Sequence, residues 1–400
     1  MQAILSRNVI LEKFKPLAIR NVINKEPLTN GGFRIYKSVK ETEEILVELP
    51  KNKEVKDIVI IEGQGIGREL VPIGLEILKL INEMFGLKLN FLTEKEYPFL
   101  DVDKWEEIGE TQNRLIPQEV INLILECGAV LKGPTRTPSG ARSRQSYNVG
   151  LRQELDLFAN PRIAKYIGYG REEIDLTIVR ENTEGLYCGL GQMFGQDSAI
   201  NIRVITQEAS ERIVKYGFEL AVLNNQDTII VAEKPNILKE TGAVFLNSAK
   251  EVAKFYPNIR LQEKIIDNLG DEIASGKIKK GIIVTTNLFG DIMSDVAAGL
   301  VGGEGVAPGA NIGWKCGVFE TLAGTADNLV GTNTVNPIAI IFAASQLLEY
   351  IGRPDLAKKI YFAMEEVIKQ ECSTPDLGGK ATTQEVKKEI FGKFNFLRLL

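Results

Sequence analysis

Apolar runs of three to five residues that alternate with longer amphipathic segments are the feature that most restricts the fold of this chain. Such runs are typical of buried strands, and the segments between them have the period of helices. Their alternation predicts an α/β protein. The expected strands are 57–61, 129–131, 176–179, 228–232 and 281–285. The expected helices are 68–84, 114–126, 206–222, 237–255, 291–300, 336–351, 354–371 and 383–392.

The composition excludes several classes of protein. The 400 residues are 44% hydrophobic and 25% charged, and the net charge of −5 with dispersed basic residues argues against nucleic acid as a partner. No apolar run is long enough to span a bilayer, so no membrane partner is expected. The N-terminus lacks a secretory signal, and the four widely spaced cysteines favour reduced thiols in the cytoplasm. An organellar presequence is the less favoured alternative, because residues 1–25 hold five Lys/Arg and one Glu.

The chain has no histidine. This absence excludes Ser-His-Asp catalysis, Cys-His catalysis, His-ligated zinc and an imidazole base. Acid–base chemistry must therefore fall to Lys, Tyr, Asp or Glu, and any metal site must be built from oxygen ligands.

Two carboxylates follow the expected strand 281–285 at a spacing of four residues, Asp291 and Asp295. If the segment after Gly290 is helical, both lie on one face and can reach the same cation. Mg²⁺ and Mn²⁺ take such oxygen ligands and tolerate open positions for a substrate. Because surface helices often carry two acids at this spacing, the pair alone is modest evidence.

A glycine turn at Gly63, Gly65 and Gly67 joins the first expected strand to the first expected helix. Its spacing is GxGxG rather than GxGxxG, and no acidic residue ends a second strand about twenty residues later. An ordinary dinucleotide-binding fingerprint is therefore disfavoured, and the turn needs only the permissive backbone of glycine.

Three arginines, Arg152, Arg162 and Arg180, lie near expected strand ends, and the planar guanidinium fork is suited to carboxylates. Arg136, together with Arg142 and Arg144, adds positive charge to the same region. Each arginine alone would be interpreted as a solvated or structural ion pair. Together with the two aspartates, the group is better explained by a site for a polycarboxylate.

Two further residues can move protons. Lys234 directly follows an expected buried strand, where partial desolvation depresses the pKa of a lysine. Tyr187 follows the segment Arg180-Glu181-Asn182-Thr183-Glu184. Taken singly, Lys234 would be a surface residue and Tyr187 a core ring with its hydroxyl at the edge.

The order of these motifs closely resembles the β-decarboxylating dehydrogenases, the family that contains isocitrate, homoisocitrate and isopropylmalate dehydrogenases. The likeness runs from about Ile58 to the segment 374–379. The isocitrate branch is the most similar one in Ser146-Tyr147-Asn148 and in the segment 152–157. The isopropylmalate branch would place apolar residues at the Ser146 and Asn148 positions.

The resemblance implies a three-layer α/β fold with two discontinuous domains. Residues 56–158 and 318–400 would form a large cofactor-side domain, and 159–317 a small domain with substrate and metal residues and the dimer interface. Residues 1–55 form an extension. In this family the equivalents of Lys234 and Asp267 come from the neighbouring subunit, so the resemblance implies a homodimer with shared active sites.

The resemblance also implies a role for each candidate residue. Lys234 would assist removal of the substrate's hydroxyl proton, and Tyr187 would protonate the carbanion that decarboxylation leaves. Arg152, Arg162 and Arg180 would bind carboxylates, while Ser146 and Asn148 would recognise the distal one. The implied metal is Mg²⁺ or Mn²⁺, held by Asp267, Asp291 and Asp295.

The segment 320–329 corresponds to the family's cofactor loop and departs from its pattern. The family generally has histidine and proline where this chain has Ala323 and Asp327. The position that usually separates NAD (Asp) from NADP (Lys) is Asn328, so NAD is somewhat favoured and NADP remains possible. Gln64 and Glu304 are further departures, replacing an aspartate and an apolar residue. The implied cofactor-binding residues are Glu320, Gly324, Thr325, Ala326, Asn328 and Asn336.

Three functions follow as alternatives. The leading one is metal-dependent oxidative decarboxylation of isocitrate to 2-oxoglutarate and CO₂ with reduction of NAD(P)⁺, in the tricarboxylic acid cycle. The second is a non-catalytic regulatory subunit of an isocitrate dehydrogenase. The third is a biosynthetic relative acting on an isocitrate-like analogue, with specificity at Tyr147 and the loop 137–144.

Overall fold

The computed structural model describes residues 55–136, 145–368 and 372–397. The extension predicted at 1–55 lies outside these ranges except for its last residue. The loop 137–144 that was expected to bear specificity, with Arg142 and Arg144, also lies outside them.

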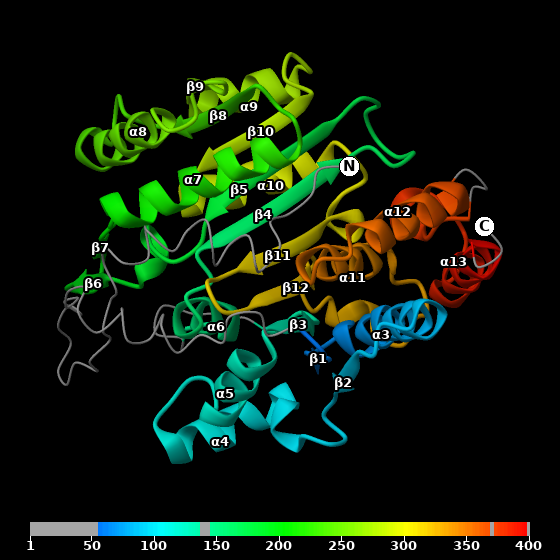
Figure 1. Ribbon diagram of the computed structural model, residues 1–400. Coiled ribbons are helices and arrows are strands. Elements are labelled where there is room, and N and C mark those ends of the chain that lie inside the picture. Colours follow the sequence, from blue (N-terminus) through cyan, green and yellow to red (C-terminus); the bar gives the residue numbers. More distant parts are fainter. Residues whose placement is uncertain (1–54, 137–144, 369–371, 398–400) are drawn as a thin grey trace.

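A ten-stranded sheet forms the centre of the molecule, in the order β2-β1-β3-β12-β11-β4-β5-β10-β8-β9 (Figure 1). The strands at both ends of the sheet are parallel to their neighbours, and β11 and β4 run antiparallel in the middle. The strands are β1 (Asp57–Ile61), β2 (Asn90–Leu92), β3 (Ala129–Lys132), β4 (Ala159–Lys165), β5 (Asp175–Glu181), β8 (Thr228–Glu233), β9 (Arg260–Ile265), β10 (Lys280–Thr285), β11 (Pro308–Ile312) and β12 (Gly317–Thr321).

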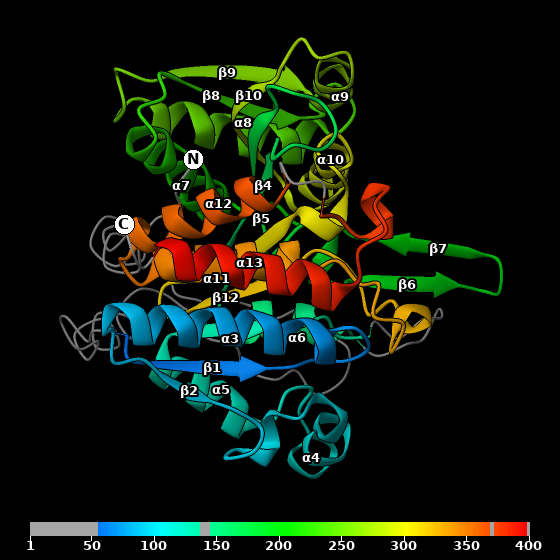
Figure 2. The same cartoon turned by 90° about the vertical axis from the view of Figure 1, so that its right-hand side faces the viewer.

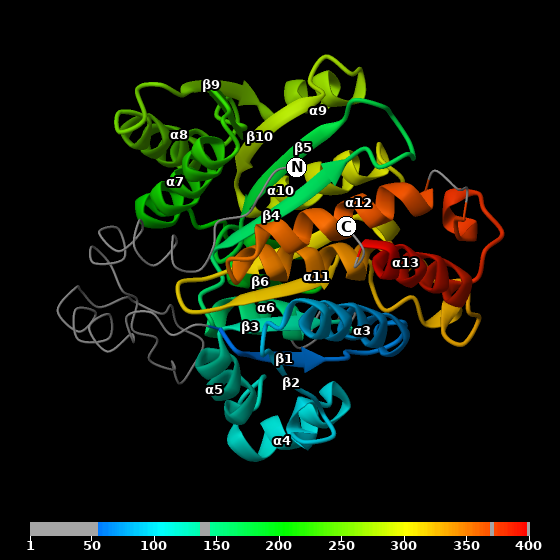
Figure 3. The same cartoon turned by 45° about the vertical axis from the view of Figure 1, so that its right-hand side comes forward.

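Helices cover both faces of this sheet. The α-helices are α3 (Gly67–Phe85), α4 (Trp105–Gln112), α5 (Gln118–Cys127), α6 (Tyr147–Glu154), α7 (Gln207–Leu223), α8 (Lys239–Ala253), α9 (Ile266–Ala274), α10 (Asn287–Gly299), α11 (Ile338–Tyr350), α12 (Pro354–Ile368) and α13 (Thr383–Leu397). Figure 2 shows α3, α11, α12 and α13 stacked on one side of the sheet. On the other side of β1, helices α5 and α4 cover the opposite face (Figure 3). The three-layer α/β architecture is thus confirmed.

Alternating side chains of β1 explain why both faces need a cover. Ile58 and Ile60 pack into the cluster that contains α3 and α11, whereas Val59 and Ile61 pack into the cluster with α5. All four are at most 2% exposed. Because successive residues of a strand point to opposite faces, a continuous apolar run of this kind requires helices on both sides.

The five expected strands are confirmed, and three helix boundaries differ from the prediction by four or more residues. The helix predicted at 383–392 continues to Leu397, and two others begin elsewhere for local reasons. The helix predicted at 114–126 begins at Gln118, because Pro117 has an extended backbone with ψ of 138° and precedes the first turn. The helix predicted at 291–300 begins at Asn287, capped by Thr286 in the extended conformation. Both aspartates therefore lie inside α10 and not at its start.

Several elements were missed because their sequences lack an apolar period or are too short to show one clearly. Strand β4 contains Asn160, Pro161 and Arg162, and β9 at the edge of the sheet is mostly polar. Helices α4, α6 and α9 are only eight or nine residues long. Such elements are specified by their neighbours in the fold more than by their own pattern.

A two-stranded arm of β6 (Gly191–Phe194) and β7 (Ser198–Asn201) projects from the body (Figure 2). Every residue of both strands is exposed. Several of them are large and apolar, including Met193 at 48%, Phe194 at 50% and Ile200 at 45% exposure.

The predicted domain boundaries stay a prediction. The sheet itself is continuous from β2 to β9, and β11 and β4 connect its two parallel ends. Among the described residues, no helix is long and apolar enough to cross a membrane.

The glycine turn is required by a close approach to the cofactor loop. Gly65 has a φ of +58°, and a Cβ there would lie 2.1 Å from the carbonyl oxygen of Thr325. The same oxygen accepts a hydrogen bond from the Ile66 N–H at 2.9 Å. Any side chain at this position would push the two segments apart.

We expect Gly65→Ala to lower the free energy of unfolding by about 2 kcal/mol more than Gly86→Ala, because only the first adds a clash to the strain of a left-handed backbone. Gly86 is the matched control, since its φ is +62° and no atom lies within 4 Å of an added Cβ. Urea unfolding of both variants measures the difference. Equal losses would show that the close approach to Thr325 contributes nothing.

Candidate active site

Charged side chains from three elements meet at the carboxyl end of β5. Arg180 is near the end of β5, Arg162 lies on the neighbouring β4, and Asp291 and Asp295 lie on α10. In parallel α/β sheets, ligands bind where strands end and the chain continues into loops and helices. This edge is therefore the candidate active site.

Asp291 is the hub of the cluster. Its Oδ1 lies 2.5 Å from Arg180 Nη1 and 3.2 Å from Arg162 Nη2. Its Oδ2 accepts a hydrogen bond from the Tyr187 hydroxyl at 2.5 Å. Burial raises the pKa of Asp291, but the charges of Arg180 and Arg162 outweigh it and hold that pKa below the ordinary value.

Arg162 connects the two aspartates. Its Nη1 donates to Ser294 Oγ at 2.6 Å and to Asp295 Oδ1 at 3.1 Å. Its Nε donates to Asn160 Oδ1 at 2.9 Å, which holds the guanidinium along β4. The side chain of Asp295 is 51% exposed, so this carboxylate faces the open side of the cluster.

Helix α10 reaches β5 because Gly290 has no side chain. A Cβ at Gly290 would lie 2.6 Å from Cβ and Cγ of Arg180. The approach lets Arg180 donate to Asn287 Oδ1 from Nε at 3.0 Å and from Nη2 at 2.6 Å. The sequence Asn287-Leu288-Phe289-Gly290-Asp291 thus supplies two acceptors for one buried arginine.

Arg152 completes a group of three guanidiniums. It is 9% exposed, and its Nε has no hydrogen-bond partner among the described residues. Burial, with the nearby charges of Arg152 and Arg162, lowers the pKa of Arg180 to about 9. A buried guanidinium with an unsatisfied N–H is costly, so this arrangement indicates a site for an anionic ligand.

The predicted distal-carboxylate residues lie at the start of α6. Ser146 caps this helix by accepting the Val149 N–H at 3.3 Å. Asn148 Oδ1 accepts the hydroxyl of Thr135 at 3.0 Å. Both side chains are half-buried, and Arg152 is on the same helix. That they share one substrate site with Arg152 stays a prediction.

Tyr187 is arranged to keep its proton. Burial and the hydrogen bond to Asp291 raise the pKa of its hydroxyl, although the Arg180 charge opposes them. The Arg180 guanidinium also lies over the ring, 5.0 Å from its centroid. A tyrosine held in this way can donate a proton at neutral pH.

Lys234 and Asp267 form a separate pair, with Lys234 Nζ 2.6 Å from Asp267 Oδ1. The Lys234 hydrogen bond lowers the pKa of the exposed Asp267 carboxyl. Within the described part of one chain, no three His, Cys, Asp or Glu side chains gather to hold a metal ion. Asp267 therefore stands apart from Asp291 and Asp295 in one protomer.

The predicted cofactor residues line the edge between β12 and α11. Glu320 is buried against Lys132, whose Nζ lies 2.7 Å from Glu320 Oε2. Asn336 Nδ2 donates to Asp376 Oδ2 at 2.9 Å. Gly324, Thr325, Ala326 and Asn328 follow β12, with Asn328 in the short turn Asp327–Leu329.

Four partners in this region were missed by sequence reasoning. The buried Lys132 and the exposed Asp376 each contact a predicted cofactor residue, and Asn287 holds Arg180. Arg136 was noted only for its charge, and it pairs with Asp327 across 2.8 Å, joining the cofactor loop to the segment after β3. No local pattern marks these pairs, because their members are distant in sequence.

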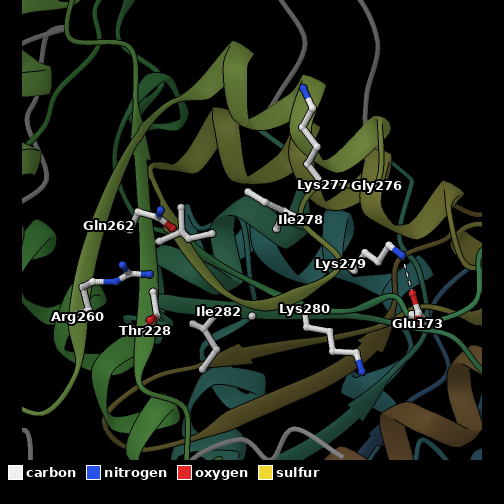
Figure 4. A pocket seen from close by; sticks show the side chains of 12 residues that line it. Glu173, Thr228, Arg260, Gln262, Gly276, Lys277, Ile278, Lys279, Lys280 and Ile282 are labelled. Atoms are coloured by element: carbon white, nitrogen blue, oxygen red, sulfur yellow. Dashed lines mark hydrogen bonds and ion pairs between the residues drawn. The ribbon is translucent and has the colours of Figure 1, made fainter.

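A hollow of about 480 Å³ lies at the opposite edge of the sheet, where β8, β9 and β10 begin. Arg260, Lys277, Lys279 and Lys280 line it. Figure 4 shows that Lys279 turns to Glu173, while Lys277 and Lys280 point in different directions. The hollow is distinct from the candidate active site because it lies at the opposite edge of the sheet. Its charged side chains do not converge on one point, so it lacks the organisation of that site.

Comparison with known proteins agrees with this geometry. The family model for isocitrate/isopropylmalate dehydrogenase matches residues 57–390. An isocitrate/homoisocitrate dehydrogenase of Thermus thermophilus is 40% identical over 339 residues, which cover 83% of this chain and 97% of that protein. A 3-isopropylmalate dehydrogenase of Archaeoglobus fulgidus is 39% identical and covers 84% of this chain and 98% of its own length.

A mitochondrial NAD isocitrate dehydrogenase regulatory subunit of Arabidopsis thaliana is 34% identical, with coverage of 86% and 92%. Among solved structures, the isocitrate dehydrogenase of Methylococcus capsulatus superposes with a TM-score of 0.76 at 34% identity and covers 84% of this chain and 98% of its own. The fold and the site thus define a decarboxylating dehydrogenase. The chain belongs to the isocitrate/isopropylmalate dehydrogenase family.

A buried acid behind the site gives a pH-dependent prediction. Burial and the neighbouring Glu181 carboxylate raise the pKa of Glu184 to about 8 from an ordinary 4.5. The folded protein therefore holds this proton more tightly than the unfolded chain does. The resulting stability is full below pH 4.5 and is lost as the pH rises toward 8.

We expect Glu184→Gln to flatten this decline, because the amide oxygen can still accept the Thr206 N–H without ionising. Urea unfolding of the wild type and the variant between about pH 5 and pH 8 measures how the free energy of unfolding changes with pH. The exposed Glu83→Gln is the control. A decline of the same slope in wild type and Glu184→Gln would contradict the assignment.

Proposed function

We propose that the protein catalyses oxidative decarboxylation of isocitrate to 2-oxoglutarate and CO₂ with reduction of NAD(P)⁺. The observation that carries this proposal is the group of three buried guanidiniums beside Asp291, where Arg152 Nε finds no partner among the residues that the structure describes. A tricarboxylate supplies the negative charges that such a group requires. The polar side chains of Ser146 and Asn148 suit a distal carboxylate better than an alkyl group.

The implied cation fits the donors present. Asp291, Asp295 and Asp267 offer hard oxygen ligands of the kind that Mg²⁺ and Mn²⁺ prefer, and Asp295 faces the open side. When bound, the cation would stabilise negative charge on substrate oxygen as a Lewis acid, and the nicotinamide would accept a hydride.

The residues of the chain would perform the remaining work. Arg180 and Arg162 would turn from Asp291 to the substrate carboxylates and so free Asp291 for the cation. Lys234, in its neutral amine form, would take the hydroxyl proton as the C–H hydride leaves, which gives the keto acid. After the C–C bond breaks and CO₂ departs, Tyr187 would give its proton to the carbanion carbon.

A homodimer would complete this site, with Lys234 and Asp267 contributed by the second copy. Their separation from Asp291 within one chain supports this arrangement. The exposed apolar residues of the β6–β7 arm, and Ile292 and Val296 on α10 at 52% and 40% exposure, offer a surface for that copy. Apolar patches of this kind mark protein interfaces.

A regulatory subunit is the second candidate, and the altered cofactor loop favours it. Ala323 and Asp327 replace the usual histidine and proline, and regulatory subunits are among the relatives. An isocitrate-like substrate is a further alternative, because isopropylmalate and homoisocitrate dehydrogenases are similar at comparable identity.

Reduction of NAD⁺, and separately NADP⁺, by the purified protein with Mn²⁺ tests the proposal. Isocitrate, isopropylmalate and homoisocitrate are compared by absorbance, with and without EDTA. EDTA-sensitive turnover preferring isocitrate supports the enzyme. No turnover with any acid, from a dimer that still binds Mn²⁺-isocitrate, would instead identify a regulatory subunit.

We expect Lys234→Met to lower kcat by at least about a hundredfold, because no other base would take the hydroxyl proton. Binding of Mn²⁺-isocitrate should change little, and calorimetry measures it beside the turnover assay. Lys250→Met, which removes an exposed lysine paired with Glu263, is the control. Normal turnover of Lys234→Met would remove this lysine from the mechanism.

We expect Asn328→Asp to raise the preference for NAD over NADP by about fivefold. A carboxylate accepts hydrogen bonds from the ribose hydroxyls of NAD and repels the 2′-phosphate of NADP. The ratio of kcat/KM values for the two cofactors measures the change. An unaltered ratio would mean that residue 328 does not face the ribose.

A further inference from the structure

One buried ion pair next to the site has no role in the reaction described above. Arg203, which follows β7, donates from Nη2 to Glu233 Oε2 at 2.7 Å. The Glu233 side chain is fully buried, and Arg203 is 13% exposed. A carboxylate in such surroundings depends on its partner, so the position of Arg203 and the end of β8 are fixed together.

The other oxygen of Glu233 acts on the next residue. Glu233 Oε1 accepts the backbone N–H of Lys234 at 2.8 Å. Lys234 is the residue proposed as the base, and its side chain reaches Asp267. The Arg203–Glu233 pair therefore orients the backbone from which the Lys234 side chain departs.

Arg203 also contacts two other elements of the site. Its Nη2 donates to Thr286 Oγ1 at 2.9 Å, directly before α10, and its Nη1 donates to Thr241 Oγ1 at 2.8 Å on α8. The guanidinium lies over the Phe289 ring, 5.4 Å from its centroid. One planar group thus links the end of β8 to the start of the helix that carries Asp291.

The chain around Arg203 is tied to the Tyr187 segment. The Gly185 N–H donates to Val204 O at 2.9 Å, and the Ile202 N–H donates to Leu190 O at 2.8 Å. Arg203 is therefore at a junction of the segments that bear Tyr187, Lys234 and Asp291. It lies at the base of the β6–β7 arm, which would contact the second copy.

We propose that Arg203 is a positioning residue: by binding Glu233, Thr241 and Thr286 together, it fixes the end of β8 against the start of α10 and so sets the position from which Lys234 reaches the site of the second copy. The inference rests on the proposed function for its kinetic test, and a second test is independent of activity. Catalytic groups must be placed to within a fraction of an ångström, and misplacement by about 1 Å can cost a hundredfold in rate.

The kinetic test compares Arg203→Gln, Arg203→Lys and the double variant Arg203→Gln/Glu233→Gln with Arg353→Gln. Arg353 is the control because it pairs with Asp355 in an ordinary, partly exposed contact. For Arg203→Gln we expect kcat to fall by about tenfold or more, with KM for isocitrate changed by less than about threefold. Arg203→Lys should recover part of kcat, since it keeps the charge but not the fork.

The double variant separates positioning from charge neutralisation. It removes the buried charge of Glu233 together with that of Arg203, so we expect the thermal midpoint to recover while kcat stays low. Recovery of kcat together with stability would overturn the proposal. A fall in kcat that is accompanied in Arg203→Gln by a matching rise in KM and a lower thermal midpoint would overturn it as well.

The independent test follows the reaction of Lys234 with acetic anhydride in the full-length protein, read by mass spectrometry. In Arg203→Gln the backbone at Lys234 is no longer held, so the Lys234 side chain should be acetylated several times faster. The acetylation rate of the exposed Lys250 should not change. An unchanged Lys234 rate would overturn the proposal whether or not the wild type turns over isocitrate. A faster rate in a protein without turnover would retain the positioning role and count against the proposed function alone.

Discussion

The contact between Arg180 and α10 is the interaction on which the site depends. Arg180 is 1% exposed and is satisfied by Asp291 and Asn287, both on the first turns of that helix. Only the missing side chain of Gly290 allows this distance. Without the helix, the arginine would be a buried cation with no partner, which costs several kcal/mol. The same contact brings Asp291 to Arg162 and Tyr187, so the packing of α10 on β5 and the arrangement of these charged and polar groups depend on one interaction.

The strength of this contact also explains what the site is prepared to bind. One carboxylate, Asp291, is shared by Arg180 and Arg162, and Arg152 adds a further charge whose Nε has no hydrogen bond within the described part of the chain. Burial, together with the charges of Arg152 and Arg162, lowers the pKa of Arg180 to about 9. A ligand with several carboxylates relieves this local excess of positive charge, whereas an uncharged ligand would leave it in place.

Much of the fold and part of the site could be predicted from the sequence. The buried strands at 57–61 and 281–285 are continuous apolar runs, and a spacing of four residues was enough to place Asp291 and Asp295 on one helix. What could not be predicted depends on contacts between distant residues: Arg180 and Asp291 are 111 residues apart. The same holds for Arg136 with Asp327, 191 residues apart. Strand β4 was missed because its polar residues serve the site and hide the apolar pattern.

We propose that the three arginines form a receptor for a polycarboxylate and that a divalent cation completes this receptor. Calorimetric titration of the cofactor-free protein with isocitrate, in the presence and absence of Mn²⁺, tests it most directly, with the monocarboxylate lactate as comparison. We expect isocitrate to bind more tightly with Mn²⁺ than without it, and lactate not to bind at the same concentration. Equal binding of both acids, or no binding of isocitrate with Mn²⁺ present, would contradict it.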